Sequence, residues 1–265
     1  MGNGGEGIDA KDACRNGKIH NNHVHNLYRL GIYVDAYESQ EDSIEIYGNI
    51  VHDTQSGIVV AAEKTSGTLR NVRVYNNILY DNRIHGITIS DADGGIAAGG
   101  DGPKQNITII NNTICNNGHN AQQWGGGISI VTKHPAGSNL VVRNNICSQN
   151  AQWQILRSIV TESKTTVEYN LIDGANGYDD GEDRATNGSN FKTGSPMFVN
   201  ASAHNFQLRL GSPAIDAGSA ANAPLIDYTG AARPRDGDGN GTATFDIGAY
   251  EYQPIPSSVR FWTLF

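Results

Sequence analysis

The sequence predicts an all-β fold, a right-handed parallel β-helix with three short strands per coil, an asparagine ladder and an irregular C-terminal cap. Three observations lead to this prediction: Gly-Ile pairs recur along the 265 residues, strands ending in asparagine alternate with them, and glycine is abundant. Gly and Asn are poor helix formers, but they suit tight turns between strands. Repeats spaced by tens of residues are typical of solenoids.

The first strand of each coil carries the pattern Gly-Ile-x-apolar. Successive copies are separated by roughly 24 to 41 residues, which is the length of a solenoid coil. Because side chains alternate between the two faces of a strand, the isoleucine of every copy is expected to point inward. We therefore predict one inward stack, formed by Ile8, Ile32, Ile58, Ile87 and Ile128.

The second strand of each coil ends in asparagine. Its amide can bond the turn backbone and the same residue of the next coil, which predicts a ladder. The ladder residues are Asn22, Asn49, Asn77, Asn112, Asn145 and Asn170. An apolar residue two places later marks the third strand, at Val24, Val51, Leu79, Ile114, Cys147 and Ile172. A leucine-rich repeat is the alternative solenoid, but leucine is scarce and no helical stretch separates the strands.

The pattern divides the chain into four parts. The β-helix coils cover residues 1–173, and residues 174–193 are rich in Gly, Asn and Asp and are predicted to form a loop. A different motif fills residues 194–253, which we interpret as a C-terminal cap or last coils, followed by an apolar tail at 254–265. Because repeat-like sequence follows the first residue directly, we interpret the chain as a fragment that lacks N-terminal coils and a signal peptide.

Composition excludes several classes of function. The net charge of −8 argues against a nucleic-acid partner, which requires a basic face. No apolar run has the length of a membrane span. Three cysteines without compact spacing form neither a disulfide framework nor a metal site. We expect a monomer.

The Gly-Ile strands, the asparagine-ended strands and the segment from Ser212 to Glu251 resemble secreted bacterial right-handed β-helix proteins, a group that includes pectate-lyase-like enzymes. Glu6-Gly7-Ile8-Asp9, followed one coil later by Gly31-Ile32-Tyr33-Val34, is similar to the ninth family of polysaccharide lyases. The resemblance implies a polysaccharide substrate, calcium at Asp9 and near Glu6, and a secreted or cell-surface location. Tyr33 stands where the family places a lysine base.

A candidate site lies on the outward face of the Gly-Ile strands. If Ile8 points inward, Asp9 and Lys11 point outward. Tyr33 then stacks on Asp9 and Asp35 on Lys11, about 4.8 Å away. Glu63 follows in the next coil, where Val59 and Ala61 leave the surface small and apolar.

Neighbouring turns and insertions extend this face into an elongated groove. The turns add Tyr28, Arg29, Arg83 and His85, and the insertions 91–105 and 116–126 form walls, the second with Trp124. A groove lined by carboxylates, cations and aromatic rings suits a chain of sugars, because aromatic faces pack on apolar sugar faces.

Two chemistries fit these residues. In β-elimination, Glu6, Asp9 and Asp35 hold calcium, and the candidate bases are Lys11, Arg29 and Tyr33. In hydrolysis, Asp9, Asp35 and Glu63 supply a pair of carboxylates. A glycan-binding or surface-displayed solenoid without chemistry, and an inactive fragment, are the alternatives. Lys11 and Asp35 can equally form a structural cross-strand ion pair.

A second metal site is predicted near the end of the chain. Asp236, Asp238 and Asn240 place oxygen ligands at alternate positions, with Gly241 at the sixth, as at the start of an EF-hand loop. The glutamate expected at the twelfth position is replaced by Ile247. The prediction is a structural calcium ion, and the alternative is a tight polar turn.

His25 and His52 occupy matching positions on the third strands of two successive coils. We expect a solvent-facing stack there, with a metal pair as the alternative.

Overall fold

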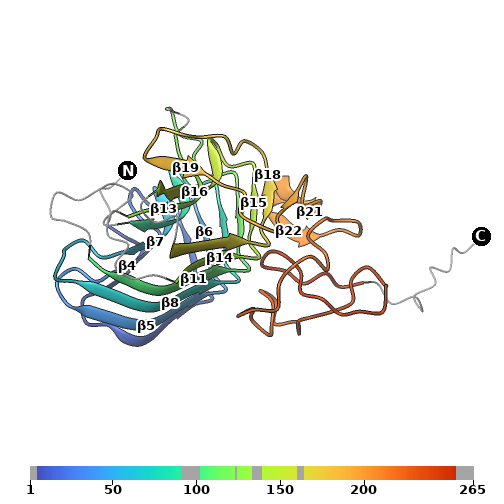
Figure 1. Ribbon diagram of the computed structural model, residues 1–265, viewed down its shortest axis with the longest axis horizontal. Coiled ribbons are helices and arrows are strands. Elements are labelled where there is room, and N and C mark those ends of the chain that lie inside the picture. Colours follow the sequence, from blue (N-terminus) through green and yellow to red (C-terminus); the bar gives the residue numbers. More distant parts are fainter. Residues whose placement is uncertain (1–4, 91–101, 123, 133–138, 160–163, 255–265) are drawn as a thin grey trace, which may run out of the picture.

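The computed structural model describes residues 5–90, 102–122, 124–132, 139–159 and 164–254. Its regular structure is almost entirely β, arranged as a solenoid with three sheets in which all strands but one edge strand pair parallel (Figure 1). A short 3-10 helix, η2 (Ala201–Ala203), lies near the start of the C-terminal segment. Within those ranges no helix has both the length and the apolar character needed to cross a membrane.

The Gly-Ile strands form the first sheet, called here the Gly-Ile sheet. It consists of β1 (Ile8–Lys11), β4 (Ile32–Asp35), β7 (Ser56–Ala61), β10 (His85–Ser90), β13 (Gly126–Val131), β16 (Trp153–Ser158) and β19 (Asp183–Ala185). The register pairs each predicted isoleucine with the next and extends the stack to Ile155. The predicted inward stack is therefore confirmed.

The other two strands of each coil form two further sheets. The asparagine sheet consists of β2 (Arg15–His20), β5 (Gln40–Tyr47), β8 (Thr68–Tyr75), β11 (Lys104–Ile110), β14 (Leu140–Arg143) and β17 (Thr165–Glu168). The short-strand sheet consists of β3 (His23–His25), β6 (Ile50–His52), β9 (Ile78–Tyr80), β12 (Thr113–Cys115), β15 (Ile146–Ser148), β18 (Leu171–Asp173) and β20 (Lys192–Thr193). Each coil thus supplies one strand to each sheet, which makes the fold a parallel β-helix with three strands per coil.

The asparagine ladder follows the turns between the asparagine and short-strand sheets. Each side-chain amide donates to the side-chain oxygen of the asparagine in the next coil, at 2.9 to 3.0 Å. The structure adds a second ladder that the sequence analysis missed, in which Asn82, Asn117 and Asn150 continue from Thr54 to Gln154. Both ladders satisfy buried turn backbone that strands cannot pair.

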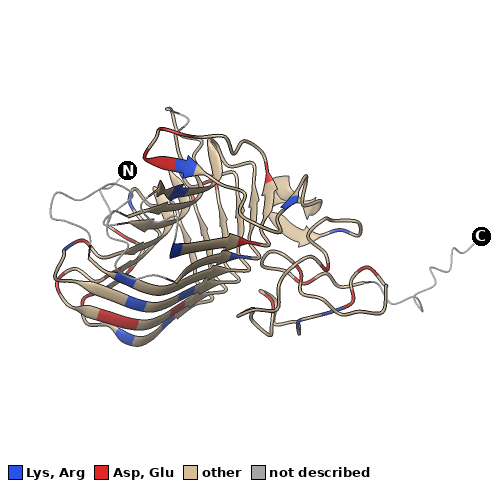
Figure 2. Cartoon of the chain, viewed as in Figure 1, with Lys and Arg blue, Asp and Glu red and all other residues tan. Residues whose placement is uncertain are grey.

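The outward face of the asparagine sheet carries charges of alternating sign on adjacent strands (Figure 2). Lys18 Nζ lies 3.5 Å from Glu45 Oε1, and Arg70 Nη2 lies 2.9 Å from Asp42 Oδ2. The charges on this face therefore form cross-strand ion pairs between coils.

Residues 174–193, predicted as a loop, include β19 and β20. The first strand pairs antiparallel with β16 and the second pairs parallel with β18. These two strands extend the edges of two sheets, so only the intervening turns are irregular.

Residues 194–254 lie along the side of the solenoid instead of continuing its end (Figure 1). They begin with the hairpin β21 (Phe198–Asn200) and β22 (Asn205–Leu208). Phe198, Phe206 and Ile247 pack on outward apolar side chains of the short-strand sheet, including Tyr80 and Ile146. The segment covers the part of this sheet whose outward side chains are also apolar, from β9 to β18. The predicted tail from 255 onward lies outside the described residues.

Three turn asparagines in left-handed backbone conformation fasten this segment. Asn76 donates to the carbonyl of Ile226, Asn111 to that of Asp246, and Asn144 to that of Ser219. One turn residue from each of three successive coils therefore holds the C-terminal segment in register with the solenoid.

Candidate active site and metal centre

The first two coils bring Lys11 and Asp35 together as the register predicts. Lys11 Nζ lies 2.7 Å from Asp35 Oδ2, and the ammonium also lies 4.6 Å from the Tyr37 ring centroid and 5.7 Å from that of Tyr33. The lysine side chain is 40% exposed, whereas Asp35 is completely buried. The cross-strand ion pair is confirmed, and it leaves the cation at the surface.

The charged groups in this cluster shift one another's pKa values. Burial alone would lower the pKa of Lys11, but the hydrogen bond and charge of Asp35, together with Glu63 and Asp9, raise it above 10.5. Burial raises the pKa of Asp35, opposed by Lys11. Burial also raises the pKa of Asp9, opposed by Lys11 and reinforced by Glu6 and Glu63. The cluster is thus a fixed cation among several carboxylates.

The neighbouring part of the predicted groove is closed. Val59 and Ala61 are fully buried and pack with Leu30 and Tyr33, so the prediction of an open, bland surface at this point is wrong. The Tyr33 hydroxyl donates to Glu63. The apolar outward side chains of β4 and β7 attract Leu30 from the preceding turn, which excludes solvent from this strip.

His85 is also enclosed, which corrects its prediction as a substrate-binding residue. It is 1% exposed, lies 3.2 Å from the Ser129 hydroxyl, and packs against the rings of Trp124 and Trp153. Burial lowers its pKa to about 3, so it is a neutral core side chain at neutral pH. Trp124 remains 40% exposed at the surface of this aromatic cluster.

The remaining predicted side chains lie in turns around the first coils. Arg29 Nε is 3.3 Å from Glu6 Oε1, and its side chain is 46% exposed. Arg83 donates to the carbonyls of Leu27 and Tyr28, and its guanidinium lies 5.9 Å from the exposed Tyr28 ring. Arg83 therefore braces the turn that carries Tyr28 and Arg29. Residues 91–101 of the first predicted wall lie outside the described residues.

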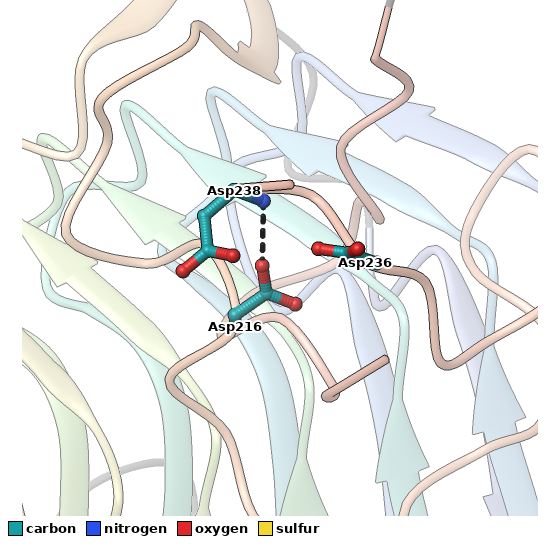
Figure 3. Close-up of side chains that lie close together, drawn as sticks. All are labelled: Asp216, Asp236 and Asp238. Atoms are coloured by element: carbon teal, nitrogen blue, oxygen red, sulfur yellow. Dashed lines mark hydrogen bonds between the residues drawn. The ribbon is translucent and has the colours of Figure 1, made fainter. Parts of the chain in front are cut away.

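The predicted calcium ligands of the first coils are not gathered around one point. Glu6 pairs with Arg29 and Asp35 pairs with Lys11, so two of the three predicted carboxylates already face a cation. In the part of the chain that the structure describes, three candidate metal-ligating side chains meet only at Asp216, Asp236 and Asp238 (Figure 3). One oxygen of each lies within 4.8 Å of the others.

This C-terminal carboxylate cluster combines the predicted loop with a residue that the sequence analysis missed. Asp216 Oδ2 accepts the backbone N–H of Gly237 at 2.9 Å and that of Asp238 at 2.8 Å, the second of which is drawn in Figure 3. Its Oδ1 atom is buried and has no hydrogen-bond partner among the described residues. Asp216 belongs to the Ser212–Gly218 motif, but only the fold brings that motif to the loop.

The predicted loop is also held by its own side chains. Asp236 accepts the backbone N–H groups of Gly239, Asn240 and Gly241. Asn240 donates to Asp238 Oδ2 at 2.9 Å, and its oxygen accepts the N–H of Thr242. Asn240 therefore acts within the turn, while Asp236 and Asp238 face Asp216.

The family model described as "Right handed beta helix region" matches residues 1–102. These residues hold the first coils of the parallel sheets, so the match and the topology agree. The chain is a right-handed parallel β-helix protein. No curated protein matches this β-helix protein. Among solved structures it is similar to one titled "Crystal structure of pectate lyase Pel9A", with 12% identity, a TM-score of 0.46, and coverage of 93% of this chain and 70% of that one.

The β-helix protein also has a cleft that the sequence analysis missed, between the asparagine sheet and the C-terminal segment. It has a volume of about 550 Å³, and its lining includes Tyr47, Arg73, Tyr75, Leu225 and Tyr228. The rings of Tyr47 and Tyr75 stack at 4.9 Å, and Leu225 is 73% exposed. The cleft could not be found from local sequence because its two walls are about 150 residues apart, as the Asn76–Ile226 hydrogen bond shows.

Proposed function

We propose that this protein cleaves a uronate-containing polysaccharide by β-elimination at the exposed edge of the first coils. The observation that carries the proposal is Lys11, a surface cation held 2.7 Å from the buried Asp35, with Asp9 two residues before it on the same strand. In this reaction a base takes the proton from the carbon next to the uronate carboxylate. A carbon–carbon double bond then forms as the glycosidic oxygen leaves.

Lys11 is the best placed of the three candidate bases. A guanidinium group, as in Arg29, is a poor base, and the Tyr33 hydroxyl donates a hydrogen bond to Glu63 beside a buried apolar cluster. Lys11 is exposed and loses a proton only at alkaline pH, because Asp35 holds its pKa above 10.5. Arg29, which is half exposed beside Glu6, is suited to pair with the substrate carboxylate.

Hydrolysis has less support from the geometry. It requires two carboxylates on either side of the bond. Asp35 is fully buried beneath Lys11, and Glu63 accepts the hydrogen bond from Tyr33. Asp9 alone among the three predicted carboxylates is both exposed and without an ion-pair distance to a described cation.

Calcium does not fit the first coils, where Glu6 and Asp35 each face a cation and only Asp9 of the predicted ligands has no ion pair to a described cation. It fits the C-terminal carboxylate cluster, because oxygen ligands are what calcium requires and the buried Asp216 Oδ1 lacks another partner among the described residues. We propose a structural calcium ion held by Asp216, Asp236 and Asp238. When bound, it would offset two of the three negative charges and tie the loop to the Ser212–Gly218 motif.

The test is an assay of the purified chain on pectic, alginate and neutral plant polysaccharides, with calcium and with a chelator. Ultraviolet absorbance reports unsaturated products and a second assay reports reducing ends. We expect absorbance to increase with a uronate polymer, and to be lost in Lys11→Met. Lys18→Met is the matched control, since Lys18 forms a similar pair with Glu45 on another sheet. Reducing ends without absorbance would contradict elimination.

A second candidate function is glycan binding without cleavage, and the aromatic cleft favours it. Tyr47, Tyr75 and Tyr228 line the cleft, and aromatic rings are a common surface for sugars. Retention of the chain in a polysaccharide affinity gel, with no cleavage and with loss of retention in Tyr228→Ala, would support binding alone. With either function, a substrate outside the cell implies a secreted or surface location.

A further inference from the structure

Three histidines lie on the outward face of the first two strands of the short-strand sheet. His23 and His25 are on β3, and His52 is on β6 beside His25. The rings of His25 and His52 stack with centroids 5.1 Å apart and planes within 5°. The predicted histidine stack is thus confirmed, but His23 lies beside the stack.

The imidazole rings of His23 and His52 face each other through their Nε2 atoms. The Nε2 atoms of the two rings are 2.8 Å apart, although the residues are on different coils. Two imidazole nitrogens approach in this way when they share a proton or face a common ion. On a tetrahedral ion with bonds of about 2.0 to 2.1 Å the two nitrogens would be about 3.3 Å apart, so an opening of roughly 0.5 Å admits the ion.

We propose that His23 and His52 form a binding site for a divalent transition-metal ion of the zinc class, which links the first two coils. Imidazole nitrogen selects zinc, copper or nickel over calcium. This site therefore differs in chemistry from the all-oxygen cluster at Asp216. Water completes the coordination, and His25 lies beside the pair with its Nδ1 atom 2.9 Å from Asn26.

The Asp53 carboxylate contacts the His52 ring on the side opposite His23. His52 Nδ1 lies 2.6 Å from Asp53 Oδ2, so the carboxylate favours a proton on Nδ1, which leaves the lone pair of Nε2 toward His23. Metal-ligating histidines are commonly oriented by a carboxylate in this way. Stacking of His52 between His25 and Tyr80 further limits rotation of its ring.

The backbone positions both ligands before the ion enters. Strands β3 and β6 are paired with His23 opposite Ile50 and His25 opposite His52, so His23 reaches His52 diagonally across the two strands. The site therefore needs little reorganisation when the ion enters.

The experiment is a calorimetric titration of the full chain with zinc chloride at neutral pH, with excess calcium present to occupy the carboxylate cluster. We expect one zinc ion per chain and a higher Tm that a chelator reverses, because a ligand that binds only the folded state stabilises it. His23→Ala should weaken binding more than tenfold and Asp53→Asn about tenfold. The matched control is His20→Ala, an exposed histidine stacked on Tyr47, and it should bind as the parent does.

A spectroscopic measurement keeps the proposal testable if a variant changes stability. With copper(II) as the probe, electron paramagnetic resonance should show coupling to two nitrogens in the parent and to one in His23→Gln. Absence of zinc binding by the parent, or unchanged binding in both His23→Ala and Asp53→Asn, would overturn the proposal. Two coupled nitrogens in His23→Gln would also overturn it, since another residue would then be the ligand.

Discussion

Lys11 and Asp35 form an ion pair between the first two coils in which the carboxylate is completely buried and only the lysine reaches solvent. The buried charge therefore depends on one partly exposed partner. Removing the lysine therefore leaves a buried carboxylate without its partner. Removing the aspartate instead lowers the pKa of the lysine.

Replacement of Lys11 by Met should lower the free energy of unfolding by about 1–2 kcal/mol. Loss of Lys11 leaves the charge of Asp35 buried and uncompensated. The expected loss of stability is smaller than for a fully buried ion pair, because Lys11 is partly exposed. Urea denaturation measures the effect. Lys18→Met should cost less than about 0.5 kcal/mol, since both members of its pair are exposed or half-buried. Equal losses of unfolding free energy in the two variants would contradict the view that the buried carboxylate of Asp35 depends on Lys11.

The rate of elimination, if the proposed function holds, should increase with pH through the neutral and alkaline range. Asp35 raises the pKa of Lys11 above 10.5, so the deprotonated base is a small fraction that grows with pH. Asp35→Asn removes the main cause of this shift and should move the rise to lower pH. Initial rates of absorbance increase over a pH series measure this, and an identical profile in the variant would argue for another base.

Glu41 should make the protein less stable as pH rises. It is fully buried, its carboxylate oxygens have no hydrogen-bond partner among the described residues, and burial, with Asp35, Asp12 and Asp9, raises its pKa from 4.5 to about 8. Between these values the folded state holds a proton that the unfolded state has lost. The free energy of unfolding then falls by up to about 1.4 kcal/mol per pH unit.

Glu41→Gln tests this dependence, because it keeps the shape and removes the titration. The difference in unfolding free energy between the variant and the parent should grow from about pH 4.5 to about pH 8 and be constant above it. Denaturation curves at several pH values give the difference. A difference that does not vary with pH would show that Glu41 titrates normally.

Asn112→Ala should destabilise the solenoid by about 3–5 kcal/mol. Its amide donates to the carbonyl of Val74 and to Asn145, and its oxygen accepts from the backbone and side chain of Asn77, all of them buried. Each buried group left without a partner costs about 1–3 kcal/mol. The comparison is Asn106→Gly, at an exposed asparagine with a φ of 55°, which should cost less than about 1 kcal/mol.

Calcium should raise the Tm of the parent and not that of the double variant Asp236→Asn, Asp238→Asn. Without calcium, the variant is relieved of repulsion among the three carboxylates, but each asparagine also replaces one accepting oxygen with an amide donor, so the calcium-dependent change in Tm is the quantity that tests the site. Thermal unfolding with calcium and with a chelator separates the two effects. A calcium-dependent rise that survives in the variant would place the ion elsewhere.

The repeat pattern predicted the coils well because each rung depends on local residues. Ile32, Ile58 and Ile87 alternate with outward side chains, and Asn77 and Asn112 end their strands, so register follows from spacing in the sequence. The same reasoning placed Lys11 beside Asp35. It missed the second ladder because Thr54 and Gln154 interrupt the asparagine pattern at its two ends.

The sequence by itself determined the solenoid, its inward stack and the adjacency of residues on neighbouring coils, because strand pairing in a repeat is a nearest-neighbour property. Only the tertiary structure decided which outward faces meet solvent. It buried Val59 and His85, covered the short-strand sheet with residues 194–254, and brought Asp216 to Asp236 and Asp238. It also turned His23 toward His52. These contacts join segments distant in sequence or depend on side-chain direction, and neither is encoded in a local period.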